Sequence, residues 1–354
     1  MESVSPSALR IQKAAAWMVV LAGIVFCLSY FSAMLQPVVV AVMIWYCVYE
    51  LRRLIQKVKI KKRTAPTGLA NLLAFVVIFL IGWGFFEIMT INLELIIEKS
   101  PLYAENFKAM LRELQSIKQF NEVQERALER LQKIDVQPVL TGLLNSLSNI
   151  AGNVFVIVIY VTFMLVEEKF FYKKLHAFSH TEDQHHRLDG VIDQIVKSIR
   201  QYVSVKTQMS VLTGVLSYFI LLGFRVDFAV LWAFLIFVLN YIPYIGSFFA
   251  TLFPALFALF QYQSGWIFLW VFVAIQIVQF GVGNVLEPKV MGRQLNLSPL
   301  GVMLALTFWG AIWGVLGMFL SVPITSVMLI SFSRFESTRF IAVWLSETGE
   351  IDAG

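Results

Sequence analysis

The chain of 354 residues is 58% hydrophobic and only 14% charged, with a formal net charge of +5. Soluble domains have about a quarter of their residues charged, so this composition leaves too few polar side chains to cover a water-exposed core. These values argue against a soluble fold and indicate a protein whose solvent is the lipid bilayer.

An uncharged apolar stretch comes first, at residues 14–49. As a helix it would be about 54 Å long, whereas the hydrocarbon core of a bilayer is about 30 Å thick. Proline lacks a backbone donor and interrupts helices, so Gln36-Pro37 predicts two helices joined by a tight turn. A cleaved signal peptide over residues 1–33 is the alternative, disfavoured because the apolar stretch continues directly into a second span.

The sequence RRLIQKVKIKKR at residues 52–63 holds seven basic residues and no acid. Short basic loops beside membrane spans lie in the cytoplasm, which predicts a cytoplasmic loop here and a cytoplasmic N-terminus. Contact with anionic lipid headgroups is a secondary expectation, and no binding of nucleic acid is expected.

Residues 64–86 predict a third span, so that residues 1–92 form an N-terminal group of three membrane helices. In residues 93–138 acidic and basic side chains balance, and apolar residues recur at helical spacing. This pattern predicts an amphipathic helical segment outside the bilayer, on the side opposite the basic loop. A cap on the chain's own membrane part or on a neighbouring subunit is favoured over a partner-binding coiled coil, because the pattern is too short for many heptads.

Residues 139–166 predict a fourth span, and residues 167–206 a mixed-charge helical segment back in the cytoplasm. That segment contains all four histidines: His176, His180, His185 and His186. His176 and His180 would share one helix face, but two histidines without a matching carboxylate or cysteine are weak indicators of a metal site. A solvated surface is therefore expected, with neither a metal nor a cofactor.

The remaining membrane part, residues 207–333, is the most apolar and the most interrupted. Prolines and glycines break it at NYIPYIG, at QYQSGW and at FWGAIWGVLG. Because an unpaired backbone group costs several kcal/mol in hydrocarbon, broken helices are tolerated mainly where they line a cavity. Residues 207–333 are therefore expected to form the transport half, followed by a cytoplasmic tail at residues 334–354.

Two of the breaks have similar sequences. NYIPYIG at residues 240–246 and NVLEPKVMG at residues 284–292 both place Asn, Pro and Gly at even spacing. Paired broken segments in hydrophobic stretches point to the binding site of secondary transporters. With only two occurrences, a structural repeat and a chance likeness are both open.

The motifs NYIPYIG, GNVLEPKVMGRQLNLSP and FWGAIWGVLGMFLSVP, with YVSVKTQMSVLTG at residues 202–214, resemble the autoinducer-2 exporter family of bacterial membrane proteins. The resemblance is specific over residues 202–323 and rests on the order of the spans before Pro138. It implies an all-α, polytopic helical protein of the inner membrane, with about eight transmembrane helices and broken or re-entrant segments in the C-terminal half. It also implies a homo-oligomer, expected as a pentamer, and the quorum-sensing signal autoinducer-2 as cargo, although other relatives behave as sodium–proton antiporters.

Polar and aromatic side chains near the breaks are the candidates for the translocation pathway, because a neutral polyol needs hydrogen-bonding groups inside an apolar shell. The candidates are Asn240, Tyr241, Pro243, Tyr244, Gly246, Gln276, Gln279, Asn284, Trp309 and Trp313. The candidate hinges are Gly283, Pro288, Gly292 and Pro323. Asn240 and Asn284 could instead cap helix ends. Gln276 and Gln279, on one helix face, could instead form hydrogen bonds between helices.

Glu287 stands with Lys289 and Arg293 between two long uncharged stretches. One interpretation makes its carboxylate the group that couples transport to a proton or a sodium ion, as intramembrane acids often do. The other places EPKVMGR at the cytoplasmic interface, with Glu287 paired to one of the two cations. Counting crossings from a cytoplasmic N-terminus favours the interface.

The sequence thus predicts a secondary-active exporter of a small polar metabolite, with autoinducer-2 as the leading substrate. A cation–proton antiporter, and a non-transporting oligomeric scaffold that recruits partners through residues 93–135, are the alternatives. No nucleophile–base pair, zinc set, dinucleotide fingerprint or Walker motif is recognisable, so an enzyme is not expected. The expected partners are the substrate, membrane lipids and further copies of the chain.

Overall fold

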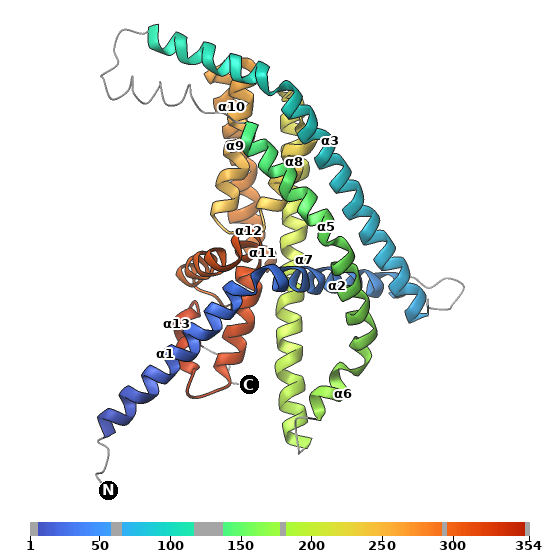
Figure 1. The fold of residues 1–354 in the computed structure, drawn as a ribbon, viewed down its shortest axis with the longest axis vertical. Coiled ribbons are helices and arrows are strands. Elements are labelled where there is room, and N and C mark those ends of the chain that lie inside the picture. Colours follow the sequence, from blue (N-terminus) through green and yellow to red (C-terminus); the bar gives the residue numbers. More distant parts are fainter. Residues whose placement is uncertain (1–5, 58–65, 117–136, 178–181, 292–295, 351–354) are drawn as a thin grey trace. The chain divides into compact units, whose positions relative to one another are not determined.

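A computed structural model describes residues 6–57, 66–116, 137–177, 182–291 and 296–350, and the regular elements in these ranges are helices (Figure 1). Outside them lie most of the predicted basic loop, the end of the amphipathic segment, His180, Gly292 and Arg293. Six of the described helices are long and apolar enough to cross a membrane, and two shorter apolar helices accompany them, Ala15–Tyr30 and Ala229–Leu239. The prediction of an all-α, polytopic membrane protein is confirmed.

The chain divides into two compact units. Unit 1 comprises Met1–Ala74, Val154–Arg187 and Leu297–Gly354. Unit 2 comprises Phe75–Asn153 and Leu188–Asn296. The candidate residues around both NYIPYIG and NVLEPKVMG therefore fall in unit 2, whereas Trp309 and Trp313 fall in unit 1.

Unit 1 begins with two helices, α1 (Pro6–Tyr30) and α2 (Ser32–Lys57). They meet at Phe31, so the predicted break at Gln36-Pro37 is wrong by about one and a half helical turns, and Pro37 lies inside α2. Hydrogen bonding continues past Phe31, whose carbonyl accepts from the Leu35 amide at 2.9 Å. Pro37 is the sixth residue of α2, beyond the first turn that favours proline, so α2 continues past it with one backbone hydrogen bond missing.

A buried ion pair joins α2 to the end of α5 (Gln137–Glu167) within unit 1. Arg52 donates to both carboxylate oxygens of Glu168, at 2.6 and 3.0 Å, and to Asn71 Oδ1 at 3.0 Å. Glu168 opens a short 3₁₀ turn that leads into α6 (Phe171–His176). Planar two-point pairing of arginine with a carboxylate is geometrically specific, so this pair fixes the register of α2 against the α5–α6 connection.

The last long helix, α12 (Pro299–Ser333), contains a sharp corner at Gly314, whose backbone is not helical (φ 63°, ψ −140°). A β-carbon added at Gly317 would lie 1.9 Å from the carbonyl oxygen of Trp309. On an uninterrupted helix these two positions would be about 12 Å apart, so α12 consists of two arms that pack against each other next to Gly314. The C-terminal α13 (Arg339–Leu345) then returns to the start of α12, where Ser298 N donates to Leu345 O at 2.9 Å.

Unit 2 begins within α3 (Thr67–Ser116), which continues without a break from the predicted third span into the predicted amphipathic segment. The C-terminal part of α3 packs on the loop at residues 224–228 and on the end of the helix Ile245–Tyr262, both in its own unit. Tyr103 donates to Asp227 Oδ2 at 2.8 Å, and Asn106 donates to Phe260 O at 3.0 Å. The described part of the amphipathic segment is therefore anchored on helices of the same chain.

Four helical pieces complete unit 2 after α7 (Glu182–Gly223). They are α8 (Ala229–Leu239), α9 (Ile245–Tyr262), α10 (Gly265–Phe280) and α11 (Glu287–Met291), with a π-helical turn η2 (Gly281–Leu286) between the last two. NYIPYIG forms a tight turn between α8 and α9, whereas residues 284–291 stay on the helical path from η2 into α11. The described parts of the two motifs thus differ in local structure, which favours a chance likeness over a structural repeat.

Candidate functional site

One face of α7 holds a row of buried polar side chains. Lys206, Ser210, Thr213 and Ser217 follow at helical spacing, and all four are buried. Residues three or four apart share one helix face, so they form a polar stripe along an otherwise apolar span. Burying such groups costs free energy unless they find partners. Thr213 donates to Met209 O within α7, and the partners of Lys206 and Ser210 come from the segments described next.

The turn after α8 supplies two of the partners. Asn240 Nδ2 donates to Ser210 Oγ at 3.1 Å, and the hydroxyls of Tyr241 and Thr207 lie 2.6 Å apart. Asn240 is the C-terminal cap residue of α8, but its side chain reaches to α7 instead of capping the helix. The capping alternative for Asn240 is therefore wrong, and two predicted pathway residues, Asn240 and Tyr241, meet on the polar stripe.

The rest of the turn explains why the chain can place these side chains inside. Gly246 packs directly on the end of α8, because a β-carbon there would lie 1.8 Å from Leu239 O. Tyr244 adopts a positive φ of 59°, and its side chain is exposed. Pro243 is half-buried between them. Gly246 and Pro243 thus shape the turn, and Tyr244 points away from the polar stripe.

Glu287, the first residue of α11, is the partner of Lys206 in the stripe. Both of its carboxylate oxygens accept from Lys206 Nζ, at 2.7 and 3.0 Å, and the two side chains are 15% and 9% exposed. Glu287 was expected to pair with Lys289 or Arg293; its partner among the described residues is Lys206 of α7, and Arg293 lies outside them. Removing one partner of a buried pair costs about 3–5 kcal/mol, so the two charges are strongly interdependent.

The helix that carries Glu287 has a π-helical turn immediately before it. The Glu287 amide donates to Val282 O, five residues back, which is the hydrogen-bond pattern of a π-helix. Gly283 lies inside this turn, and the exposed side chains of Asn284 and Pro288 lie on either side of Glu287. The carboxylate therefore follows a rare helical geometry that occurs frequently at functional sites.

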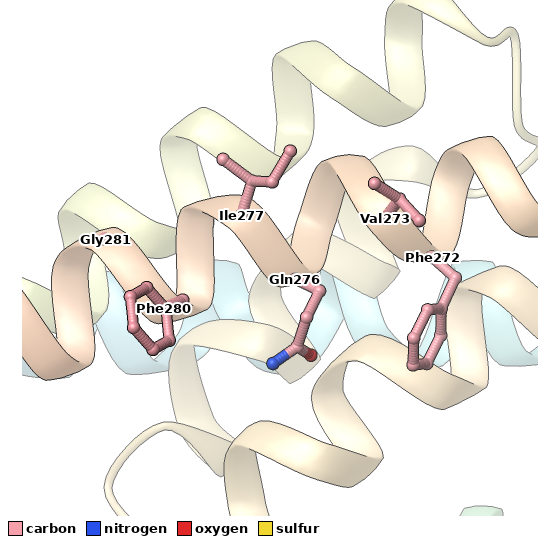
Figure 2. A pocket seen from close by; sticks show the side chains of 6 residues that line it. All are labelled: Phe272, Val273, Gln276, Ile277, Phe280 and Gly281. Carbon is pink, nitrogen blue, oxygen red and sulfur yellow. The ribbon is translucent and has the colours of Figure 1, made fainter.

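The two glutamines of α10 lie in different surroundings, contrary to the prediction that they share a face. Gln279 is buried, and its Nε2 has no hydrogen-bond partner among the described residues. Gln276 is exposed and projects between the rings of Phe272 and Phe280 at an open apolar groove of about 410 Å³ (Figure 2). The boundary of the buried face of α10 thus passes between the two residues.

Trp309 and Trp313 belong to the apolar core of unit 1. Their ring centroids lie 5.6 Å apart, with the ring planes tilted by 42°, beside the corner of α12, and Trp313 Nε1 donates to Leu28 O at 3.1 Å. This bond satisfies one of the last carbonyls of α1, which has no partner within its own helix. Pro323 lies in the second arm of α12. The polar stripe of α7 belongs to unit 2. The role of Trp309 and Trp313 as walls of the pathway therefore stays a prediction.

Sequence reasoning missed the α7 residues Lys206, Thr207, Ser210, Thr213 and Ser217. The signal was present, because a lysine and three hydroxyl residues recur at helical spacing in a span that is otherwise apolar. The prediction was based on breaks in the helices, and these breaks lie after α7 in the sequence. Among the described residues, no group of three His, Cys, Asp or Glu side chains could hold a metal ion.

Comparison with known proteins places this architecture in a family. The family model of AI-2E family transporters matches residues 15–336. A Haemophilus influenzae protein whose name assigns it to transport, without naming a cargo, is 31% identical over 81% of this chain and 84% of its own length. The AI-2 transport protein TqsA of Escherichia coli is 35% identical over 59% of this chain and 60% of its own. Because the family model covers most of the chain, from the first helix to the end of α12, the protein belongs to the AI-2E transporter family.

Proposed function

We propose that this protein is a secondary-active exporter of a small, neutral, hydroxylated metabolite, with an autoinducer-2-like molecule as the substrate. The observation that supports this most directly is the polar stripe of α7 with its partners at the α8–α9 turn. Hydroxyl and amide groups both donate and accept hydrogen bonds, which suits a ligand with several hydroxyl and carbonyl groups. The name of TqsA, a relative at 35% identity, agrees with this substrate class.

Buried polar groups without partners support a ligand in unit 2. Ser217 Oγ, Gln279 Nε2 and the Tyr202 hydroxyl are buried and have no hydrogen-bond partner among the described residues. Such groups are rare in native proteins, where water or a ligand usually satisfies them. A substrate with several hydroxyls would provide those hydrogen bonds during transport.

The proposed setting is the bacterial inner membrane, with the N-terminus in the cytoplasm and several copies of the chain in one assembly. The basic sequence at residues 52–63 supports this orientation through the positive-inside rule. The apolar groove beside Gln276 lies on an exposed face of α10 and is available to lipid or to a further copy.

Inverted membrane vesicles that contain the protein test the function. Labelled autoinducer-2 should accumulate inside them when a proton gradient is imposed, and should not accumulate in vesicles without the protein. Thr207→Val should reduce the initial rate, roughly tenfold if about 1.4 kcal/mol of substrate interaction is lost. Thr162→Val is the matched control, because Thr162 is exposed and donates only to Val158 O of its own helix.

The buried carboxylate of Glu287 favours a cation–proton antiporter as the second candidate. Adding sodium to acidified inverted vesicles should then raise the pH of the lumen. Autoinducer-2 uptake with no response to sodium supports the exporter, and the reverse result supports the antiporter. Accumulation of neither solute would contradict both transport functions and leave the scaffold as the remaining hypothesis.

A further inference from the structure

The pair of Lys206 and Glu287 is distinct from the other buried ion pair of the described chain in one respect. Arg52 is held by Glu168 and also by Asn71 and the Tyr49 ring. Lys206 Nζ has both of its hydrogen bonds on the two oxygens of Glu287. Loss of the negative charge on Glu287 would therefore remove the counter-charge of the lysine and weaken both of these hydrogen bonds, because neutral acceptors form weaker bonds than charged ones.

The groups around the pair leave Glu287 as the carboxylate that can take up a proton there. On α7, Tyr202 lies one turn before Lys206 and interacts electrostatically with Glu287 and with Tyr241 of the α8–α9 turn. On α11, Lys289 is exposed. Within the described residues, Tyr202 and Tyr241 are thus the phenols near the pair, Lys289 is exposed, and Glu287 is the one acid that forms an ion pair with Lys206.

The π-helical turn η2 gives Glu287 a way to leave Lys206. A π-helix carries one more residue per hydrogen-bonded ring than an α-helix, and one residue corresponds to about 100° of rotation around the helix. Conversion of η2 to α-helix would therefore turn Glu287 away from its present position. Gly281 and Gly283 have open space where a β-carbon would be, so the change breaks no side-chain packing at these two positions. The packing it must rearrange is that of buried Val282 on Val205 and Met209.

The pair is also continuous with the proposed substrate site. Thr207, which contacts the Tyr241 hydroxyl, follows Lys206 directly, and Ser210, which contacts Asn240, lies one turn further on. A lysine released from Glu287 would need new acceptors, and the nearest polar atoms of the stripe are those proposed to bind substrate. Occupation of the substrate site and the charge of Glu287 are thereby linked through α7.

We propose that Glu287 carries the proton that drives export, that Lys206 holds its ionised form, and that η2 is the element that moves when the charge changes. One proton adds to the carboxylate from the side of higher proton concentration and leaves it toward the other side, while Lys206 stays protonated. This inference rests on the proposed export function and names its driving ion and the residues that carry it.

Proteoliposomes of the full chain with a trapped pH-sensitive dye test the coupling. In the native protein, flux of labelled autoinducer-2 should be accompanied by proton movement in the opposite direction. Glu287→Gln should lower the number of protons moved per autoinducer-2 molecule exchanged by an order of magnitude or more. Exchange should also lose its dependence on pH, because glutamine does not titrate.

Glu168→Gln is the matched control, since it weakens the other buried pair. It should lower thermal stability and leave the ratio of protons to autoinducer-2 unchanged. Proton movement that survives in Glu287→Gln would overturn the proposal, as would equal loss of exchange and stability in both variants. Coupling to sodium in place of protons would overturn the assignment of the ion.

A measurement without substrate separates this proposal from the export function. Hydrogen–deuterium exchange of the peptide over residues 281–291, relative to that of α9, should rise as the pH falls in the native protein and in Glu168→Gln. It should not change in Glu287→Gln. A pH response without any flux of autoinducer-2 would contradict the proposed substrate and support the proton site, and absence of the response would contradict the proton site itself.

Discussion

The turn between α8 and α9 and the corner of α12 use the same packing device for different purposes. In the turn, Gly246 lies against the carbonyl of Leu239, and in the corner, Gly317 lies against the carbonyl of Trp309. The turn carries Asn240 and Tyr241 into hydrogen bonds with α7, whereas the residues beside the corner are aromatic and pack in an apolar cluster.

This difference separates two meanings of a broken membrane helix. Glycine lets two backbones approach closely. That alone is sufficient to form a sharp corner inside apolar packing, as α12 shows. A break indicates a polar site only when it also places buried hydrogen-bonding side chains beside another polar helix face. Of the two breaks compared, the turn at Asn240 meets that condition, because Asn240 and Tyr241 contact Ser210 and Thr207 of α7.

The largest expected effect comes from adding one methyl group at either glycine. Gly246→Ala and Gly317→Ala should each destabilise the protein by about 3 kcal/mol or more, because the β-carbon would overlap a backbone carbonyl that cannot move freely. Thermal unfolding in detergent measures this effect. Gly310→Ala is the graded control, since its β-carbon would meet only the flexible side chain of Met318. Equal stability of all three variants would contradict the close backbone contacts.

A second pair of variants separates transport from packing. Asn240→Leu leaves buried Ser210 without its donor and should lower stability by about 1–3 kcal/mol. Adding Ser210→Ala should restore most of that stability without restoring transport. Trp313→Phe loses one hydrogen bond to Leu28 and should cost about 1 kcal/mol, with transport per folded molecule retained. Loss of transport in stable Trp313→Phe would instead place the tryptophan in the pathway.

The smallest expected effect is that of Tyr241→Phe. It removes one hydroxyl from the pair with Thr207, but Thr207 keeps its bond to Val203 O at 2.6 Å, so the stability change should be below about 1 kcal/mol. The concentration of autoinducer-2 at half-maximal rate should rise severalfold at an unchanged maximal rate. An unchanged concentration dependence would show that this hydroxyl does not contact substrate.

Much of the fold follows from the sequence because hydropathy reports directly on the bilayer. The composition predicted the class of protein, and the prolines and glycines predicted that the C-terminal half departs from simple spans. The position of a break was less predictable. Gln36-Pro37 lies inside α2, and Pro288 lies within α11, because a proline removes a single backbone hydrogen bond and does not by itself determine where a helix ends.

The candidate site was predictable in part. Asn240, Tyr241, Gln279 and Glu287 were recognised because polar groups are rare and costly in apolar segments. The partners of these residues were not predicted. Lys206 precedes Glu287 by 81 residues, so no local spacing in the sequence connects the two. Gln276 was misplaced for a related reason, because helical periodicity gives the angle between two residues and leaves open which of them faces inward.

The sequence by itself determined that this chain is a membrane protein, which of its segments are apolar enough to be spans, and which kinds of side chain are available for transport. These are local properties, set by the transfer of each segment from water to lipid and by the backbone of proline and glycine. Only the tertiary structure decided that Glu287 meets Lys206, that Asn240 meets Ser210, and that α12 turns at Gly314. Such pairings depend on which helix faces pack together, and packing is a property of the whole fold that no single segment contains.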